Sequence, residues 1–207
     1  MTVEKVKLWV GTPRELHALL NSHRYASTNK SFKHKVGHFI VGAVFAGTEE
    51  HPAGHRHSDS LQRATLVIFD IDNAPDLTRA ELEARLCSLG VGFIFYSTWS
   101  NARAGSGKTG LCARIVFWLT RPLTAPDSLP QDQRVQLIGQ QLAAIVRYLS
   151  ACLEIDSTKA VDEVSKRPHQ LMYSPRGHDA GRSSPDCWWC ELHDGPALNP
   201  DSLPGGV

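Results

Sequence analysis

An apolar run that ends in two aspartates constrains this chain more than any other stretch. Residues 66–69 read Leu-Val-Ile-Phe, and Asp70 and Asp72 follow with one isoleucine between them. A short apolar run bounded by Arg63 and Pro75 is typical of a buried strand. Alternate side chains of a strand share a face, so we expect the two carboxylates on one side, roughly 6.6 Å apart by the strand rise alone.

Two carboxylates at the end of a core strand need a positive partner. A divalent cation that prefers oxygen ligands is the usual one. The alternative is that Asp70 and Asp72 only cap the strand and begin a turn before the next helix. The pair by itself leaves both interpretations open, so the rest of the chain has to decide.

The length and composition predict one large domain. The chain has 207 residues, 42% hydrophobic residues and a formal net charge of +1. We predict a domain over residues 1–195 and a Pro/Gly-rich tail or linker over residues 196–207. The neutral balance does not exclude nucleic acid, because a basic groove can exist within a neutral total.

The cysteines and the apolar runs bear on location. Five scattered cysteines, an odd number, favour a reducing compartment over a disulfide framework. The first ten residues do not resemble a signal peptide, and no apolar run reaches the length needed to span a membrane. We therefore expect a cytoplasmic protein without a membrane partner.

The periodicity predicts an α+β fold with a mainly antiparallel sheet. Helices are expected at about 13–21, 79–89 and 131–153, and strands at 36–46, 66–73, 93–96, 113–119, 170–173 and 187–193. The strands at 93–96 and 113–119 enclose a Gly-rich stretch, Gly105 to Gly110, which predicts an antiparallel hairpin. No internal repeat is present.

The same Gly-rich stretch has a partial phosphate-loop pattern. Ala102 followed after four residues by Gly107-Lys108-Thr109 satisfies the looser form of that motif. The motif works only where the loop enters a helix, whose first N–H groups bind the phosphates. Here a β-rich run, residues 113–119, follows instead. A phosphate-loop ATPase is therefore a lesser alternative, although Lys108 could contact a phosphate in another fold.

Three ordered stretches resemble the motifs of the archaeo-eukaryotic primase (AEP) superfamily, in its plasmid and phage primase-polymerase form. The first is the apolar strand ending in Asp-x-Asp, residues 66–72. The second is the strand and Ser/Thr-rich turn of residues 95–101 with the Arg-apolar-Pro-Leu strand of residues 114–123. The third is residues 161–175, Val-Asp-Glu-Val-Ser-Lys-Arg-Pro-His-Gln-Leu-Met-Tyr-Ser-Pro. The resemblance spans about residues 30–202.

The resemblance implies a metal-dependent nucleotidyltransferase built on an RNA-recognition-like (RRM-like) sheet flanked by helices. Such chemistry uses two divalent ions, Mg²⁺ or Mn²⁺, that clamp the attacking and leaving oxygens. The implied catalytic and metal-binding residues are Asp70, Asp72 and Asp162. Asp162 is preferred as the third ligand because its distance to Gln170 matches the family pattern, and Asp156 is the alternative.

The resemblance also implies nucleotide-binding side chains on the second and third motifs. These are Ser100, Asn101, Lys108, Arg114, Gln170 and Tyr173. Arg114 could hold a triphosphate through two parallel hydrogen bonds, or lie as a surface arginine on its strand. Gln170 and Tyr173 fit a nucleotide contact and plain strand packing equally.

One departure affects the triphosphate contacts. The family usually has a histidine where this chain has Asn101. Asparagine can donate a hydrogen bond but carries no charge. Either Asn101 with Lys108 and Arg114 substitutes, or the nucleotide is held less tightly, or catalysis is lost. The alternative function is therefore a degenerate AEP-like module that binds nucleic acid in replication.

The implied partners are those of a replication enzyme of a plasmid, phage or mobile element. They are a single-stranded DNA template, a primer strand, nucleoside or deoxynucleoside triphosphates, and a replicative helicase domain or protein. A further motif, Cys187-x2-Cys190 flanked by His178 and His193, fits either a zinc site or a Trp/Cys core strand.

Overall fold

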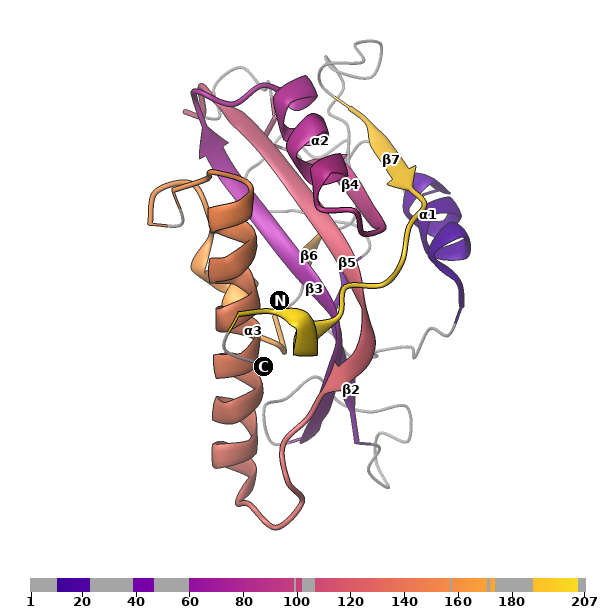
Figure 1. Cartoon of the computed structure of the whole chain (residues 1–207), viewed down its shortest axis with the longest axis vertical. Helices are drawn as coiled ribbons and strands as arrows, with labels where there is room; N and C mark the ends of the chain where they lie inside the picture. Colours follow the sequence, from indigo (N-terminus) through magenta and orange to yellow (C-terminus); the bar gives the residue numbers. More distant parts are fainter. Residues whose placement is uncertain are drawn as a thin grey trace.

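The computed structural model describes residues 11–22, 39–46, 60–98, 100–101, 107–156, 158–170, 172–173 and 188–204 (Figure 1). The helices are α1 (Pro13–Ser22), α2 (Arg79–Ser88) and α3 (Gln131–Cys152), with the short 3-10 helices η2 (Glu163–Lys166) and η4 (Pro200–Ser202). The strands are β1 (Phe39–Ile40), β2 (Ala43–Phe45), β3 (Leu61–Ala74), β4 (Phe93–Ser97), β5 (Leu111–Leu123), β6 (Met172–Tyr173) and β7 (Cys190–His193).

The central sheet confirms the α+β prediction. Its five strands lie in the order β2-β3-β5-β4-β7, and each neighbouring pair is antiparallel. The expected hairpin of β4 and β5 is present. Since β3 and β4 are both antiparallel to β5 between them, they run parallel to each other, and α2 connects them. This β3-α2-β4-β5 unit is a split βαβ arrangement.

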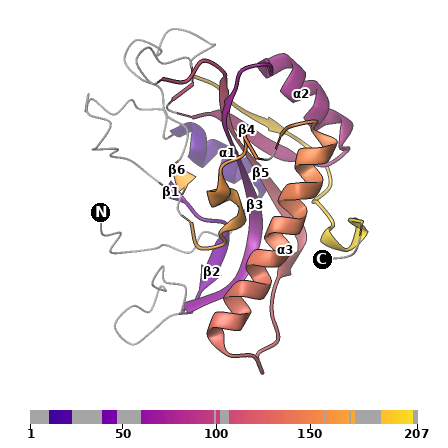
Figure 2. The same ribbon diagram turned by 90° about the vertical axis from the view of Figure 1, so that its left-hand side faces the viewer.

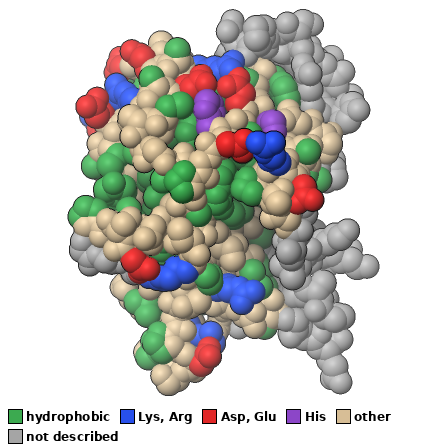
Figure 3. All heavy atoms as spheres, turned by 45° about the vertical axis from the view of Figure 1, so that its right-hand side comes forward, with side chains coloured by type: hydrophobic (Ala, Val, Ile, Leu, Met, Phe, Trp, Pro, Cys, Tyr) green, Lys and Arg blue, Asp and Glu red, His purple; other side chains and the backbone are tan. Residues whose placement is uncertain are grey.

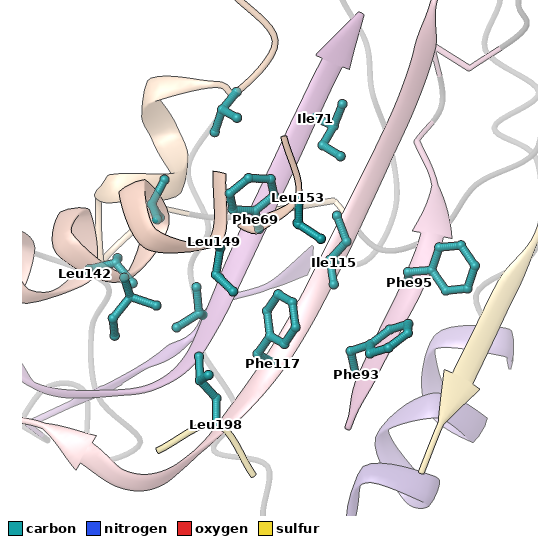
Figure 4. Packing of buried hydrophobic residues seen from close by; sticks show 14 of the residues in the cluster. Phe69, Ile71, Phe93, Phe95, Ile115, Phe117, Leu142, Leu149, Leu153 and Leu198 are labelled. Carbon is teal, nitrogen blue, oxygen red and sulfur yellow. The ribbon is translucent and has the colours of Figure 1, made fainter. Parts of the chain in front are cut away.

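Helices cover the two faces of the sheet unequally (Figure 2). On one face, α2 and α3 pack on the larger hydrophobic cluster, in which Phe69 and Phe117 from the sheet lie toward Leu149 of α3 (Figure 4). The other face carries α1 and β6, and a smaller cluster in which Leu20 packs with Ile68. Burial of these apolar side chains is the main force that holds both layers on the sheet.

The alternation along β3 assigns the aspartates to a face. Phe69 and Ile71 belong to the cluster under α3, whereas Ile68 belongs to the cluster under α1. Asp70 and Asp72 lie two and four residues after Ile68. Because alternate residues of a strand share a face, both aspartates project from the face that α1 covers. The same-face expectation for the two carboxylates thus agrees with the packing of the strand.

Several of the predicted strand boundaries differ from the structure. The described part of the 36–46 strand is two strands, β1 and β2, in separate sheets, with Gly42 between them. A side chain at Gly42 would place its Cβ 2.7 Å from the carbonyl oxygen of Leu66, so the chain can pass only with glycine there. β3 and β5 are longer than predicted, with 14 and 13 residues.

The segment expected as a tail or linker packs against β5. The Leu198 N–H donates to the carbonyl of Trp118 at 2.9 Å, and the Leu198 carbonyl accepts from Thr120 at 3.0 Å. Leu198 and Leu203 are buried in the larger cluster. Residues 196–204 therefore contribute to the hydrophobic core.

Among the described helices, none combines the length and apolar character required to cross a membrane.

Candidate active site

A row of four side chains crosses the sheet at Asp70. Asp70 lies opposite Arg114 on β5, Arg114 lies opposite Tyr96 on β4, and Tyr96 lies opposite Cys190 on β7. Directly opposed residues on neighbouring strands project to the same face and contact each other. The register therefore lines up an acid, a base and a phenol on the α1 face. No sequence pattern assigned Tyr96 to the site, because only the strand register brings it here.

Asp70 and Arg114 form a buried bidentate pair. The Nη2–Oδ2 and Nε–Oδ1 distances are 2.5 and 3.1 Å, and the side chains are only 7% and 10% exposed. Burial raises the pKa of Asp70, and Arg114 opposes that shift. Burial also disfavours charge on Arg114, but Asp70 and Tyr96 outweigh it, so the pKa of Arg114 is raised. Arg114 is thus committed to Asp70 rather than placed on the surface.

Asp72 pairs with a lysine from the Gly-rich loop. Lys108 Nζ lies 2.7 Å from Asp72 Oδ2, and the two side chains are 32% and 43% exposed. The hydrogen bond from Lys108 to Asp72 raises the pKa of the ammonium. Cys112, opposite Asp72 on β5, has its Sγ 3.9 Å from Asp72 Oδ1. Burial raises the pKa of that thiol to about 11, so Cys112 is protonated at neutral pH.

Backbone pairing brings Asp162 beside the first two aspartates. The Asp162 N–H donates to the Asp70 carbonyl at 3.0 Å, and Val161 forms an antiparallel bridge with Ile71. The negative charge of Asp162 acts on Asp70, where it raises the pKa of the carboxyl. Its own carboxylate accepts a hydrogen bond from the Val164 N–H at 3.0 Å. All three aspartates therefore lie at one end of β3, although their carboxylate oxygens do not all lie within 4.8 Å of one another.

Asp156, the alternative third acid, is held in a turn. Its Oδ1 accepts hydrogen bonds from the backbone N–H of Thr158 at 2.9 Å and from the hydroxyl of the same residue at 2.6 Å. Lys159 lies 3.4 Å from its other oxygen. The acids whose charges raise the pKa of Asp70 are Asp162 and Asp72. The placement thus favours Asp162 over Asp156.

An asparagine that the sequence reasoning missed ties the Gly-rich loop to β3. Asn73 Oδ1 accepts hydrogen bonds from the N–H groups of Thr109 at 2.9 Å and Gly110 at 2.8 Å. Asn73 has φ of 75°, a left-handed conformation that asparagine tolerates better than most residues. A Cβ on Gly110 would lie 2.3 Å from the Ala74 carbonyl carbon, so the loop approaches closely only because that residue is glycine. An asparagine directly after Asp-x-Asp at a strand end was the available signal.

Asn101 supports the backbone of β5. Its Oδ1 accepts a hydrogen bond from the buried N–H of Cys112 at 3.1 Å, and Ser100 is half-buried in the same turn. A second support missed from the sequence is Ser165, whose hydroxyl accepts a hydrogen bond from the Asp70 N–H at 2.9 Å. Both contacts fix the backbone at the ends of the site.

Gln170 lies in a small pocket that adjoins the site. The pocket is lined by Gln170 with Leu66, Ile68, Ser165 and Met172 among others. Since Leu66 and Ile68 precede Asp70 on the same face of β3, the pocket continues the line of the carboxylates. Tyr173 lies in β6, opposite Phe39, and its side chain is outside the described part of the structure.

The phosphate-loop alternative does not fit the fold. Lys108 and Thr109 lead through Gly110 directly into β5, a strand that pairs with β3 and β4. The loop therefore has no helix N-terminus after it, which the phosphate-binding mechanism requires.

The cysteine motif also does not assemble as a zinc site from the residues that are described. Cys190 shares the row with Tyr96, whereas His193, three residues on, projects from the opposite face of β7 and stacks on Phe93 at 4.6 Å. Burial raises the pKa of the Cys190 thiol to about 12. Cys187 and His178 lie outside the described residues.

His193 instead belongs to a group on the other face. Ligand atoms of Glu83, Glu191 and His193 all lie within 4.8 Å of one another, a grouping that could hold a metal ion. In Figure 3, histidine side chains lie among acidic and basic ones on one face of the molecule. Arg79 forms an ion pair with Glu191, and His193 Nε2 lies 3.1 Å from Glu83. Ion pairing between α2 and β7 thus already engages these groups.

The three aspartates form an all-oxygen donor set. Carboxylate oxygens are the ligands that Mg²⁺ and Mn²⁺ prefer. Asp72 is half exposed, so an ion can reach it from solvent. By their chemistry the three residues therefore fit a divalent metal of this class, which would draw their carboxylates closer together than they lie here.

Comparisons with known proteins give little beyond this geometry. No protein-family model matches the sequence, and no curated protein matches it. Among solved structures, the AEP domain of the primase-polymerase of cyanophage S-2L is similar, with 13% sequence identity and a TM-score of 0.38. The match covers 78% of this chain and 63% of that chain. A likeness this low carries no argument, so the function has to be inferred from the residues of the site.

Proposed function

We propose that this chain is a DNA-templated nucleotidyltransferase, a primase or DNA polymerase, whose catalytic acids are Asp70, Asp72 and Asp162. The observation that carries the proposal is the backbone pairing of Asp162 with Asp70. It supports the proposal because residues of the third primase-like motif lie next to the first, although the two motifs are far apart in sequence. A metal centre with three acidic ligands needs its acids on neighbouring segments.

Asp70, Asp72 and Asp162 would hold two Mg²⁺ or Mn²⁺ ions. Bound there, the ions would supply charge stabilisation for the attacking hydroxyl and the leaving pyrophosphate. The protein's own part is orientation: Ser165 fixes the Asp70 backbone, and Arg114 fixes the Asp70 carboxylate. A carboxylate held by several contacts has little freedom to lose when a ligand binds.

We assign triphosphate binding mainly to Lys108. Arg114 is buried against Asp70, and Asn101 accepts a hydrogen bond from the backbone of Cys112. Lys108 is more exposed than Arg114 and lies on a glycine-containing loop next to the acids. The small pocket lined by Gln170, Leu66 and Ile68 adjoins the acids and has room for about one water molecule.

The proposal is tested by nucleotide incorporation on primed and unprimed single-stranded DNA with Mn²⁺ or Mg²⁺. We expect the wild type to add nucleotides, and the Asp72→Asn and Asp162→Asn variants to lose at least about a hundredfold in rate. Asp156→Asn is the matched control, an acid in the same segment that should retain activity. Unchanged incorporation in Asp72→Asn would contradict the proposal.

A second candidate is a module that binds nucleic acid without catalysis. It is favoured by one observation: both strand aspartates are already neutralised by protein cations, Arg114 and Lys108. In that case the wild type incorporates nothing with either metal but still binds single-stranded DNA. Such binding would be as strong in the Asp72→Asn variant as in the wild type.

The remaining partners follow from the proposed activity. A template, a primer and nucleoside triphosphates are substrates of the proposed reaction. A helicase is a proposal drawn from the replication role alone.

A further inference from the structure

We propose that Lys108 competes with the divalent ion for Asp72, and that Asn73 is the positioning residue that holds it there. When the ion binds, Lys108 is displaced from the carboxylate and becomes available to a phosphate. This inference rests on the proposed function, because it assumes that Asp72 is a metal ligand. Two sets of contacts support it.

The first is the attachment of the loop. Asn73 Oδ1 accepts two hydrogen bonds, from the N–H groups of Thr109 and Gly110, directly after Lys108. These bonds fix the loop backbone relative to the end of β3, since Asn73 immediately follows Asp72. The lysine side chain therefore starts from a set position next to its acid. A free loop would lose more conformational entropy to make the same pair.

The second is the contrast between the two ion pairs. The Asp70–Arg114 pair is buried and bidentate, so breaking it would leave a buried charge without a partner. The Lys108 and Asp72 side chains are 32% and 43% exposed, and water can solvate both groups when they separate. Of the two cations, Lys108 is the one that can leave.

Simple electrostatics then couples the lysine to the metal. Lys108 Nζ lies 2.7 Å from Asp72 Oδ2. At such a distance the ammonium repels a metal ion bound to the same carboxylate. The charge of Asp162 also acts on Lys108, so the ammonium lies in the field of two of the three acids. Binding of a divalent ion among these acids must weaken the hold on Lys108, and removal of Lys108 must strengthen the hold on the ion.

The experiment is a titration of the full chain with Mn²⁺ alone, without nucleotide or DNA. The electron paramagnetic resonance signal of free Mn²⁺ reports binding at about 0.15 M salt, where charges beyond about 8 Å are screened. We expect Lys108→Met and Lys108→Gln to bind Mn²⁺ about three- to tenfold more tightly than the wild type. Damage to the fold would weaken binding, so tightening is specific to lost competition.

Asn73→Gly isolates the positioning role. Glycine accepts the left-handed backbone but has no carboxamide, so only the two hydrogen bonds to the loop are lost. We expect about twofold tighter Mn²⁺ binding, because Lys108 is then held less firmly on Asp72. Arg121→Met is the matched control: it removes one positive charge from the exposed pair with Asp201 and should leave Mn²⁺ affinity unchanged.

The outcomes separate the two proposals. If the wild type binds Mn²⁺, Asp72→Asn loses that binding and Lys108→Met binds no more tightly, the competition is overturned while the metal site stands. If neither the wild type nor Lys108→Met binds Mn²⁺ through Asp72, the metal site of the proposed function fails, and the competition fails with it.

Discussion

At the scale of single residues, the site depends on how a buried charge is balanced. Asp70 is nearly inaccessible to water, and its carboxylate is matched by the guanidinium of Arg114 in a two-bond contact. Isolated buried charges are strongly unfavourable, so the two residues act as one unit. The Asp-x-Asp motif could be predicted from the sequence, but its arginine partner could not be assigned to it, because only the register of β3 against β5 sets them opposite.

The Arg114→Met variant tests this unit. Losing the arginine leaves Asp70 buried without a partner, and we expect the free energy of unfolding to fall by about 3–5 kcal/mol. Chemical denaturation followed by circular dichroism measures the change. Leu111, at the start of the same strand, is half-buried, and Leu111→Met is a control expected to change stability by less than about 1.5 kcal/mol.

The pH dependence of that variant has a definite sign. Burial already raises the pKa of Asp70 above its ordinary value of 3.8, and without Arg114 to oppose it the pKa rises further. A carboxyl with a raised folded-state pKa contributes stability below its unfolded pKa and loses it as the pH rises through the folded value. The loss in the free energy of unfolding caused by Arg114→Met should therefore be larger at about pH 7 than at about pH 4. Equal losses at both pH values would contradict a buried charged Asp70.

At the scale of elements, segments that look irregular in sequence complete the core. The sequence predicted the strand order of the hairpin and the long helix α3, because apolar spacing there is regular. It did not predict that residues 196–204 pack on β5, because their proline and glycine content is typical of a linker. Leu198 attaches this segment to the core, because its side chain is buried in the larger cluster and its backbone forms hydrogen bonds with β5.

Replacement of Leu198 tests the role of that segment. Leu198→Ala removes a buried side chain from the larger cluster, and we expect the free energy of unfolding to fall by about 2–4 kcal/mol. Urea denaturation at neutral pH measures it. Leu19, on the outer side of α1, is 36% exposed, and Leu19→Ala should cost much less. Similar costs for the two variants would mean that residues 196–204 add little to the core.

At the scale of the whole molecule, three segments distant in sequence meet at the end of β3. Residues 70–73, 108–114 and 160–162 each contribute a charge or a backbone contact to the same place. The sequence named Asp70, Asp72 and Asp162 by their motifs, and it preferred Asp162 over Asp156 by the distance to Gln170. It could not predict the backbone pairing that brings residues 160–162 beside β3, because no local pattern encodes that pairing.

The central claim is that these three acids form the metal centre of a nucleotidyltransferase. The most direct measurement is a crystal structure of the chain with Mn²⁺ and a non-hydrolysable nucleoside triphosphate, with anomalous diffraction to locate the metal. We predict manganese bridged by Asp70, Asp72 and Asp162, with Lys108 moved from Asp72 toward the triphosphate. Manganese found at Glu83, Glu191 and His193, with Asp70 and Asp72 still paired to Arg114 and Lys108, would contradict the account.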